Sequence, residues 1–432
     1  MSRPYGTIAQ PLHDSPAERA SHGTKVDVVA GSSAVLRQLN SRAVLDALKR
    51  STTPLRVAEI MKSTNLSRPT VETVTEGLWG QGWLTVDEPE RVPAGRLGRP
   101  ARRYSFNATA GHIVGVDIGA HSVAVSVAGL RGDVIATIRR RVSPDFDAPH
   151  RVKVTADVVK EILAQTKVAS RNVFAVTVGT PGTVFPSNQR IGKSPGMPGW
   201  PETDLLAALR EQAAFDIQLE NDANLAAVGE RARGVGQGCR DMLFLLLGER
   251  LGAGVIANGA LIRGRDGGAG EVGYAPVPGA RGRPSGFGPL EALVNARALV
   301  ELGRSAVAKD PHSQLADLCD GDPERLTAEA ITLAAAEGDS AATRVLRTQV
   351  RVLAKGIAPA LLTLNPELLV LGGGMSRAGE VLRKLLTSQI NRLVLYPPEV
   401  RISALGDEAV LVGAIEESIK RVELNVLSKV SA

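Results

Sequence analysis

One pattern occurs twice in this chain and limits its fold: an apolar strand, a glycine turn and a second apolar strand. The first copy covers residues 113–118 and 123–127, and the second covers 242–247 and 252–257. Short apolar runs bounded by glycine turns predict buried strands. Their recurrence indicates two similar lobes with a cleft between them. Glycine turns also join ordinary hairpins, so the pattern alone is only suggestive.

The rest of the body alternates in the same way. Further strands are expected at 134–138, 173–178 and 260–262, and helices at 154–167, 342–362 and 409–424. This alternation is typical of an α/β fold. The last two helices are amphipathic; their apolar stripes supply either core or a dimer surface.

The first quarter of the chain has a different pattern of apolar residues. Residues 1–32 show no apolar period and predict a flexible tail. Helical spacing follows at 33–49 and 56–63, and Ser67 is placed to cap a third helix that ends near residues 80–82. A tight turn before the third helix predicts a helix-turn-helix unit. A plain three-helix bundle is the structural alternative.

A basic hairpin is expected after these helices. Strands at 83–86 and 104–106 flank a loop whose residues 91–103 contain five arginines and no acid. Helix-turn-helix plus hairpin predicts a winged helix, whose Gly98-Arg99-Pro100 segment suits a narrow minor groove. A flexible basic linker is the alternative interpretation.

Charge supports a double-stranded DNA partner. Residues 1–110 hold 15 Lys and Arg against 10 Asp and Glu, whereas the rest of the chain is nearly neutral. The sequence does not decide whether Arg68 takes a base edge or a phosphate. The candidate DNA-binding residues are Ser67, Arg68, Thr70 and Thr73 on the third helix, with Glu72 beside them, and Arg96, Arg99 and Arg102 in the wing.

Composition excludes several classes of protein. Cys239 and Cys319 are the only cysteines, which excludes a disulfide framework. No apolar run reaches the roughly 18–20 residues of a membrane helix, and no signal peptide precedes the body. We expect a cytoplasmic protein that makes no membrane contact.

The motifs of the body resemble those of the ROK family (repressors, open reading frames and sugar kinases), in particular its winged-helix transcriptional regulators. The resemblance covers about residues 34–424 and implies an actin-like sugar-kinase fold with sugar bound between the lobes. The expected domains are a winged helix at 33–108, a first lobe at 109–224 completed by 405–432, and a second lobe at 225–404. The motifs are Asp117–Gly119, Gly179–Gly182, Pro198–Trp200, Glu220–Asn224, Gly252–Gly254, Gly267–Gly273, Leu290–Glu291 and Gly372–Gly374.

The resemblance implies a retained sugar site. Asn221 and Asp222 match residues that bind sugar hydroxyls, and Asp222 also stands at the position of the kinases' general base. Glu271 and Glu291 match two further sugar-contacting acids. Gly179 matches a glycine that allows close backbone approach. Surface loop residues are the structural alternative for this set.

The phosphate-binding turns depart from the kinase pattern. Residues 117–122, the first phosphate turn, carry Ala120 and His121 where the kinases have glycine and threonine. Residues 248–250, the second phosphate turn, read Gly-Glu-Arg instead of Gly-Thr-Gly. Glu249 repels phosphate, and Arg250 either compensates that charge or blocks the nucleotide by its bulk. Phosphoryl transfer depends on positioning and charge neutralisation, so these changes argue against catalysis, although Gly372–Gly374 remains at the adenosine side.

The zinc ligands of the family are replaced as well. Tyr274 stands at the position of the zinc-binding histidine, and Gly282, Pro284 and Pro289 stand where three cysteines are found. None of these four residues is a zinc ligand in a tetrahedral protein site. We therefore expect neither zinc nor another cofactor.

The leading hypothesis is a transcriptional repressor of carbohydrate genes that responds to a sugar or a sugar derivative and forms a homodimer or a higher homo-oligomer. In this mechanism, sugar closes the cleft and changes the spacing of the two winged helices on an operator. The alternatives are an ATP-dependent hexose kinase that carries a DNA-binding module, and a constitutive DNA-binding protein with a relic sugar pocket.

Overall fold

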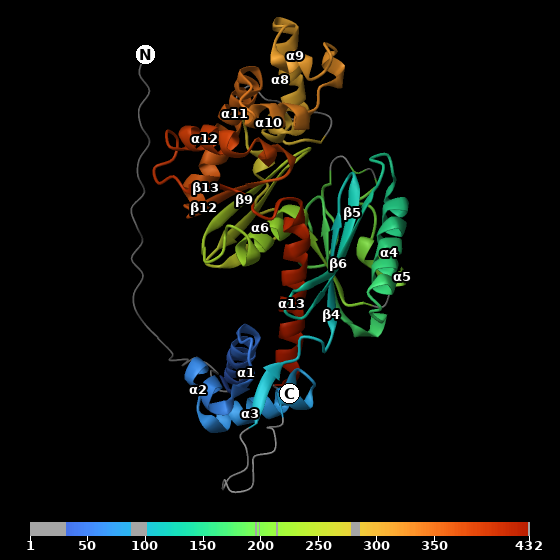
Figure 1. Cartoon of the computed structure of the whole chain (residues 1–432), viewed down its shortest axis with the longest axis vertical. Coiled ribbons are helices and arrows are strands. Elements are labelled where there is room, and N and C mark those ends of the chain that lie inside the picture. Colours follow the sequence, from blue (N-terminus) through green and yellow to red (C-terminus); the bar gives the residue numbers. More distant parts are fainter. Residues whose placement is uncertain are drawn as a thin grey trace, which may run out of the picture.

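Helix α13 (Ala409–Val430) joins the three parts of the molecule: it runs from the junction of two α/β lobes down to an N-terminal winged helix (Figure 1). The structure is a computed structural model. It describes residues 32–87, 102–194, 197, 199–212, 215–277 and 286–430. The predicted tail and most of the predicted wing loop therefore lie outside the described residues. No helix in the described ranges is long and apolar enough to cross a membrane.

The winged helix contains the expected helices and hairpin. Ser67 caps the third helix, because its hydroxyl accepts a hydrogen bond from the Thr70 amide at 3.4 Å, and Asn65 ends the second helix in the left-handed region at φ 57°. A two-residue strand that sequence analysis did not predict pairs with the hairpin. The elements are α1 (Ser32–Arg50), β1 (Leu55–Arg56), α2 (Val57–Thr64), α3 (Arg68–Gly80), β2 (Leu84–Asp87) and β3 (Arg103–Phe106), in the sheet order β1-β3-β2.

Only the second half of α1 contributes to the core. Val44, Leu45 and Leu48 are buried, whereas Leu36 and Leu39 are 60% and 59% exposed. The apolar period of this helix therefore predicted its conformation correctly, but burial begins only where α2, α3 and α13 pack against it.

The two lobes repeat one sheet plan, which confirms the duplication predicted from the strand pattern. In each lobe three antiparallel strands are followed by two parallel ones, in the orders β6-β5-β4-β7-β8 and β11-β10-β9-β12-β13. Lobe 1 contains β4 (His112–Ile118), β5 (Ser122–Gly129), β6 (Val134–Arg141), β7 (Val173–Thr180) and β8 (Ile217–Asn221). Lobe 2 contains β9 (Met242–Leu247), β10 (Leu251–Ala257), β11 (Ala260–Ile262), β12 (Leu368–Gly372) and β13 (Glu399–Ile402).

Helices cover both sheets. In lobe 1, α4 (Ala148–Gln165) and α5 (Leu205–Gln212) lie on one face, and α13 lies on the other (Figure 1). At the junction of the lobes, α6 (Asp222–Arg233) packs against both α13 and β10. Lobe 2 also contains α7 (Glu291–Val294), α8 (Ala296–Lys309), α9 (Gln314–Asp317), α10 (Ala328–Ala336), α11 (Ser340–Leu364) and α12 (Gly379–Ile390).

The winged helix shares one hydrophobic core with α13. Ile415, Ile419 and Val422 of α13 belong to the same buried cluster as Leu48 of α1 and Tyr104 of β3. Polar contacts support the junction: Lys49 pairs with Glu423 of α13, and Arg131 donates to the carbonyl oxygen of Ser51 at 3.1 Å. Because the two share a core, a movement of α13 would displace the winged helix as well.

Candidate functional site

A cavity of about 250 Å³ lies between the lobes, where β8 meets α6 and the β9–β10 turn faces them. Four of the five predicted sugar-site residues meet there: Asn221, Asp222, Glu271 and Glu291. The remaining lining residues are Pro181, Gly182, Thr183, Lys193, Leu246, Arg250, Leu251, Gly252 and Tyr274.

Gly179 does not line the cavity. A Cβ atom at this position would lie 2.8 Å from Val410 and 3.0 Å from Leu225, so the glycine allows α13 and α6 to pack closely on β7. The glycine that does line the cavity is Gly182, whose φ of 93° is in the region that favours glycine.

Asn221 and Asp222 are held at the first turn of α6. Asn221 caps the helix by accepting from the Asn224 amide at 3.0 Å, and its side-chain amide donates to the Gly182 carbonyl at 3.0 Å. Asp222 accepts from the Ala223 amide at 2.8 Å. Burial raises the pKa of Asp222 to about 6, although the Ala223 amide and Arg250 oppose the shift. At neutral pH this side chain is therefore mainly a carboxylate that accepts hydrogen bonds from hydroxyls.

Both carboxylate oxygens of Glu291 accept hydrogen bonds from other groups of the protein. One carboxylate oxygen accepts from Arg250 Nε at 3.1 Å and the Leu251 amide at 3.2 Å. The other accepts from Arg250 Nη2 and the Gly288 amide, each at 3.3 Å. The Glu291 side chain is only 3% exposed. It therefore orients Arg250 at the cavity wall, in addition to any contact with a sugar.

Arg250 forms part of the cavity wall. Its guanidinium pairs with Glu291 at 3.1 Å and lies 5.3 Å from the centre of the Phe287 ring. The sequence analysis considered Arg250 only as a phosphate-turn residue and missed its place in the interlobe cavity. It also missed Lys193, whose ammonium lies 5.8 Å from the Tyr274 ring. Neither residue belongs to a motif that was assigned to the sugar.

Glu271 and Tyr274 form another side of the cavity. Desolvation in the cleft and the neighbouring Glu291 raise the pKa of Glu271 above its ordinary value. Desolvation and Glu271 likewise raise the pKa of the Tyr274 hydroxyl. That hydroxyl donates to the Gly286 carbonyl at 3.4 Å.

The residues near Tyr274 do not fit a tetrahedral zinc ion, because tyrosine and proline replace the nitrogen and sulfur donors. Gly282 and Pro284 lie outside the described residues. Within the described ranges, no group of three or more His, Cys, Asp or Glu side chains is arranged to hold a metal ion.

In each phosphate turn, the amide of a glycine donates a hydrogen bond to a carbonyl of the same turn. Gly119 N donates to the Ser122 carbonyl at 2.8 Å, and Gly248 N donates to the Arg250 carbonyl at 3.0 Å. Asp117, at the end of β4, has its pKa raised to about 7 by burial and by Asp222. Near neutral pH, Asp117 is therefore partly protonated, whereas Asp222 is mainly a carboxylate.

The candidate DNA-binding residues gather at the start of α3. Ser67, Arg68 and Thr73 are exposed and Thr70 is half-buried. Arg68 lies 3.5 Å from Glu72, a weak pair that leaves its guanidinium accessible to DNA. Arg102 lies at the other end of α3, with its guanidinium 5.4 Å from the Trp79 ring. Arg96 and Arg99 lie outside the described residues.

Comparisons with known proteins agree with this arrangement. Residues 113–417 match the ROK family, and residues 40–88 match the IclR helix-turn-helix domain. The chain is 30% identical to a glucokinase of Thermotoga maritima over 313 residues, which are 70% of this chain and 95% of the glucokinase. It is 24% identical to the xylose repressor of Caldicellulosiruptor bescii over 391 residues, which are 89% of this chain and 96% of the repressor.

Among solved structures, a ROK family transcriptional regulator described as a homolog of the E. coli MLC protein superposes with a TM-score of 0.76. The match covers 92% of this chain and 98% of that regulator at 20% identity, which shows a common fold. The ROK match covers most of the chain, and a helix-turn-helix domain precedes it. The protein therefore belongs to the ROK family and is one of its transcriptional regulators with an N-terminal helix-turn-helix DNA-binding domain.

Proposed function

We propose that this regulator binds a sugar in the interlobe cavity without phosphorylating it, and that sugar binding releases it, as a homodimeric repressor, from its DNA operator. The observation that carries the proposal is the cavity itself. Asn221, Asp222 and Glu271 line one cavity, and their amide and carboxylate groups are of the kinds that form hydrogen bonds with sugar hydroxyls.

A chain of ion pairs connects this cavity to the DNA-binding unit. Glu220 precedes the sugar-site residues and accepts from the Asn221 amide at 2.9 Å. Its other oxygen accepts from Arg263 Nε at 2.5 Å, and Arg263 Nη2 donates to Glu417 of α13 at 2.9 Å. Since α13 shares its core with the winged helix, a change at the cleft has a route to α1.

The phosphate turns support binding without catalysis. Glu249 adds a negative charge where the kinases of the family hold phosphate, and Arg250 is engaged with Glu291. Phosphoryl transfer requires donors aimed at the phosphate oxygens. Here the amides of Gly119 and Gly248 donate to carbonyl oxygens of their own turns.

Selection of genomic DNA fragments by the purified full-length protein, with and without a sugar mixture, tests the proposal. We expect enrichment of a two-fold related site near carbohydrate genes, reduced by one sugar. Glu271→Ala should retain the site and lose the sugar response. Enrichment unaffected by any sugar would overturn the effector proposal and favour a constitutive DNA-binding protein.

A hexose kinase remains the second candidate because Asp222 occupies the general-base position with a pKa near 6. A coupled assay with Mg-ATP across hexoses and amino sugars separates the two functions. Turnover that Asp222→Asn abolishes would establish the kinase; absence of turnover at saturating sugar would exclude it.

A further inference from the structure

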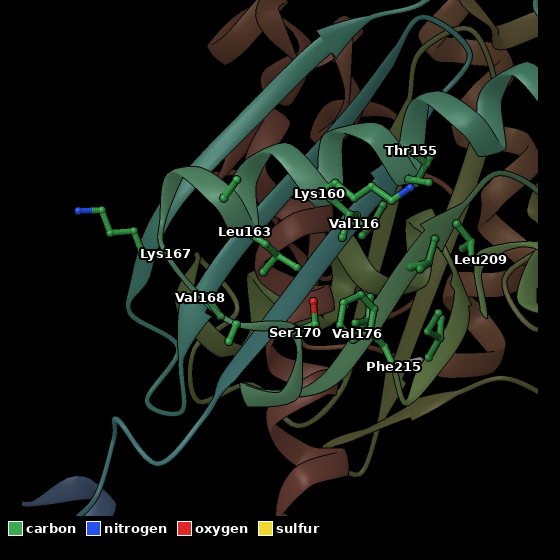
Figure 2. Close-up of a pocket in the computed structure, with 16 residues that line it drawn as sticks. Val116, Thr155, Lys160, Leu163, Lys167, Val168, Ser170, Val176, Leu209 and Phe215 are labelled. Atoms are coloured by element: carbon green, nitrogen blue, oxygen red, sulfur yellow. The ribbon is translucent and has the colours of Figure 1, made fainter. Parts of the chain in front are cut away.

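A second cavity lies inside lobe 1, between α4 and α5. Its volume is about 570 Å³. Val116 of β4 and Val176 of β7 form its floor (Figure 2), and Val178 of β7 also lines it. Helix α4 contacts β5 and β6, and α5 contacts β8. The central strands on this face therefore lie beneath the gap between the two helices, and that gap is the cavity, here called the α4–α5 pocket.

The walls of the α4–α5 pocket are apolar. Leu163 of α4 faces Leu209 of α5, and Phe215 and Ile217 complete the opposite side. Small side chains on the α4 side, including Ala156, leave the space open. Protein interiors are ordinarily packed without voids of this size, whereas ligand cavities commonly have a volume of several hundred Å³ and a mainly apolar lining.

Polar groups in the pocket are few and of one charge. Among the described residues that line it, Lys160 and Lys167 are the only charged ones, and none is an acid. Figure 2 shows the Lys160 side chain extending along the pocket, whereas Lys167 points away from it. The hydroxyl of Thr155 is engaged with the Arg151 carbonyl at 2.8 Å. The pocket thus combines an apolar interior with one ammonium group at its edge.

We infer that the α4–α5 pocket binds an amphiphilic monocarboxylate, with its hydrocarbon part against the valines of β4 and β7 and its carboxylate beside Lys160. An apolar body matches the lining, and an anionic head matches the positive charge. A cationic or strongly polar ligand is disfavoured by both features. This site is separate from the interlobe cavity: the two share no lining residue.

The strands that line the pocket also pack on α13. Successive residues of a strand point to opposite faces, so a ligand on the α4–α5 face contacts strands whose other face packs on α13. Binding in the pocket does not depend on the sugar or on DNA, so it is tested by itself.

Isothermal titration of the full-length protein with hexanoate, octanoate and decanoate tests the inference, with the alcohol of each chain length as the neutral probe. We expect one site per chain, about fourfold tighter binding for each added methylene group, and a preference for each carboxylate over its alcohol. Absence of saturable binding, or affinity that does not change with chain length, would overturn the inference.

Two variant pairs locate the site. Ala164 is exposed at the edge of the pocket, so Ala164→Trp should block entry and weaken decanoate binding at least tenfold, whereas Gln165→Trp on the next residue should not. Lys160→Met should weaken decanoate about tenfold and leave decan-1-ol unchanged, and Lys153→Met is its control on the same helix. Equal binding by wild type and Ala164→Trp would place the ligand elsewhere and refute this site.

Discussion

His121 Nε2 lies 2.7 Å from Glu249 Oε1, and this contact joins the β4–β5 turn of lobe 1 to the β9–β10 turn of lobe 2. These turns occupy equivalent places in the repeated sheet plan, and in the kinases of the family both bind phosphate. Here the replaced side chains contact each other instead. Both side chains are more than half exposed, so the pair contributes about 0–1 kcal/mol to stability, and it holds the Glu249 carboxylate at the β9–β10 turn.

Removing that carboxylate should improve nucleotide binding. We predict that Glu249→Gln raises the affinity for Mg-ATP by about fivefold or more, because it removes the repulsion between a carboxylate and the phosphates. Calorimetric titration with Mg-ATP measures the change. Glu337→Gln, an exposed site elsewhere in lobe 2, is the control. Equal affinity for both variants would mean that Glu249 is not what keeps nucleotide out.

Arg250 should matter for stability as well as for sugar binding. Arg250→Met leaves the buried Glu291 carboxylate without its guanidinium, and we expect a loss of about 2–4 kcal/mol in the free energy of unfolding. The double variant Arg250→Met/Glu291→Gln should recover most of that loss, because the uncompensated charge is gone. Urea denaturation of both variants measures the effect; equal losses would show that the ion pair is not the cause.

Asp117 should make the protein less stable as the pH rises. Its folded-state pKa is raised from 3.8 to about 7, so its contribution is fully present below pH 4 and lost as the pH rises through 7. The full shift corresponds to about 4 kcal/mol, which solvent at this half-buried side chain reduces to about 2 kcal/mol. Asp117→Asn should therefore be more stable than wild type at pH 8 and similar at pH 4.

Urea denaturation of wild type and Asp117→Asn at both pH values tests this prediction. Asp133→Asn, at an exposed carboxyl in the β5–β6 turn, should follow the wild-type pH dependence. If Asp117→Asn followed it too, a different group would be responsible for the loss of stability.

Arg263 should couple sugar binding to DNA release. Arg263→Met breaks the link from Glu220 to Glu417 without touching the cavity lining. We predict sugar affinity within about threefold of wild type, unchanged DNA affinity in the absence of sugar, and a sugar effect on DNA binding reduced at least fivefold. Arg265→Met is the matched control, since Arg265 is exposed and, within the described part of the chain, forms its ion pair with the neighbouring Asp266.

Fluorescence anisotropy with labelled operator, titrated with sugar, measures the coupling in both variants. Coupling is a free energy between two sites, so sugar affinity must also be measured with and without DNA. A full sugar response in Arg263→Met would exclude this route.

Arg68→Ala should weaken operator binding. A lost base contact costs about 1–3 kcal/mol and relaxes specificity at one position, whereas a lost phosphate contact lowers affinity for every sequence and reduces the salt dependence. Anisotropy with operator and unrelated DNA at several salt concentrations distinguishes the two. Arg42→Ala on α1, also exposed, is the control, and an unchanged Arg68→Ala would remove α3's first turn from the DNA interface.

Local sequence determined most of the secondary structure. Ser67 and Asn65 set the turn before α3 by short-range hydrogen bonding and backbone preference, and the apolar runs at 113–118 and 242–247 predicted β4 and β9. Such signals act over a few residues, so they can be recognised without knowledge of the fold. The motif order likewise predicted the family and the four residues that meet at the cavity.

Tertiary structure alone decided which distant side chains meet. Arg250 reaches Glu291 across 41 positions and His121 reaches Glu249 across 128, while Gly179 makes room for Val410 rather than for a ligand. Leu39 is exposed despite its helical spacing, because helical periodicity does not show which part of α1 other elements cover. A residue's chemistry can be read from the chain, but its partner is selected by how the lobes and α13 pack.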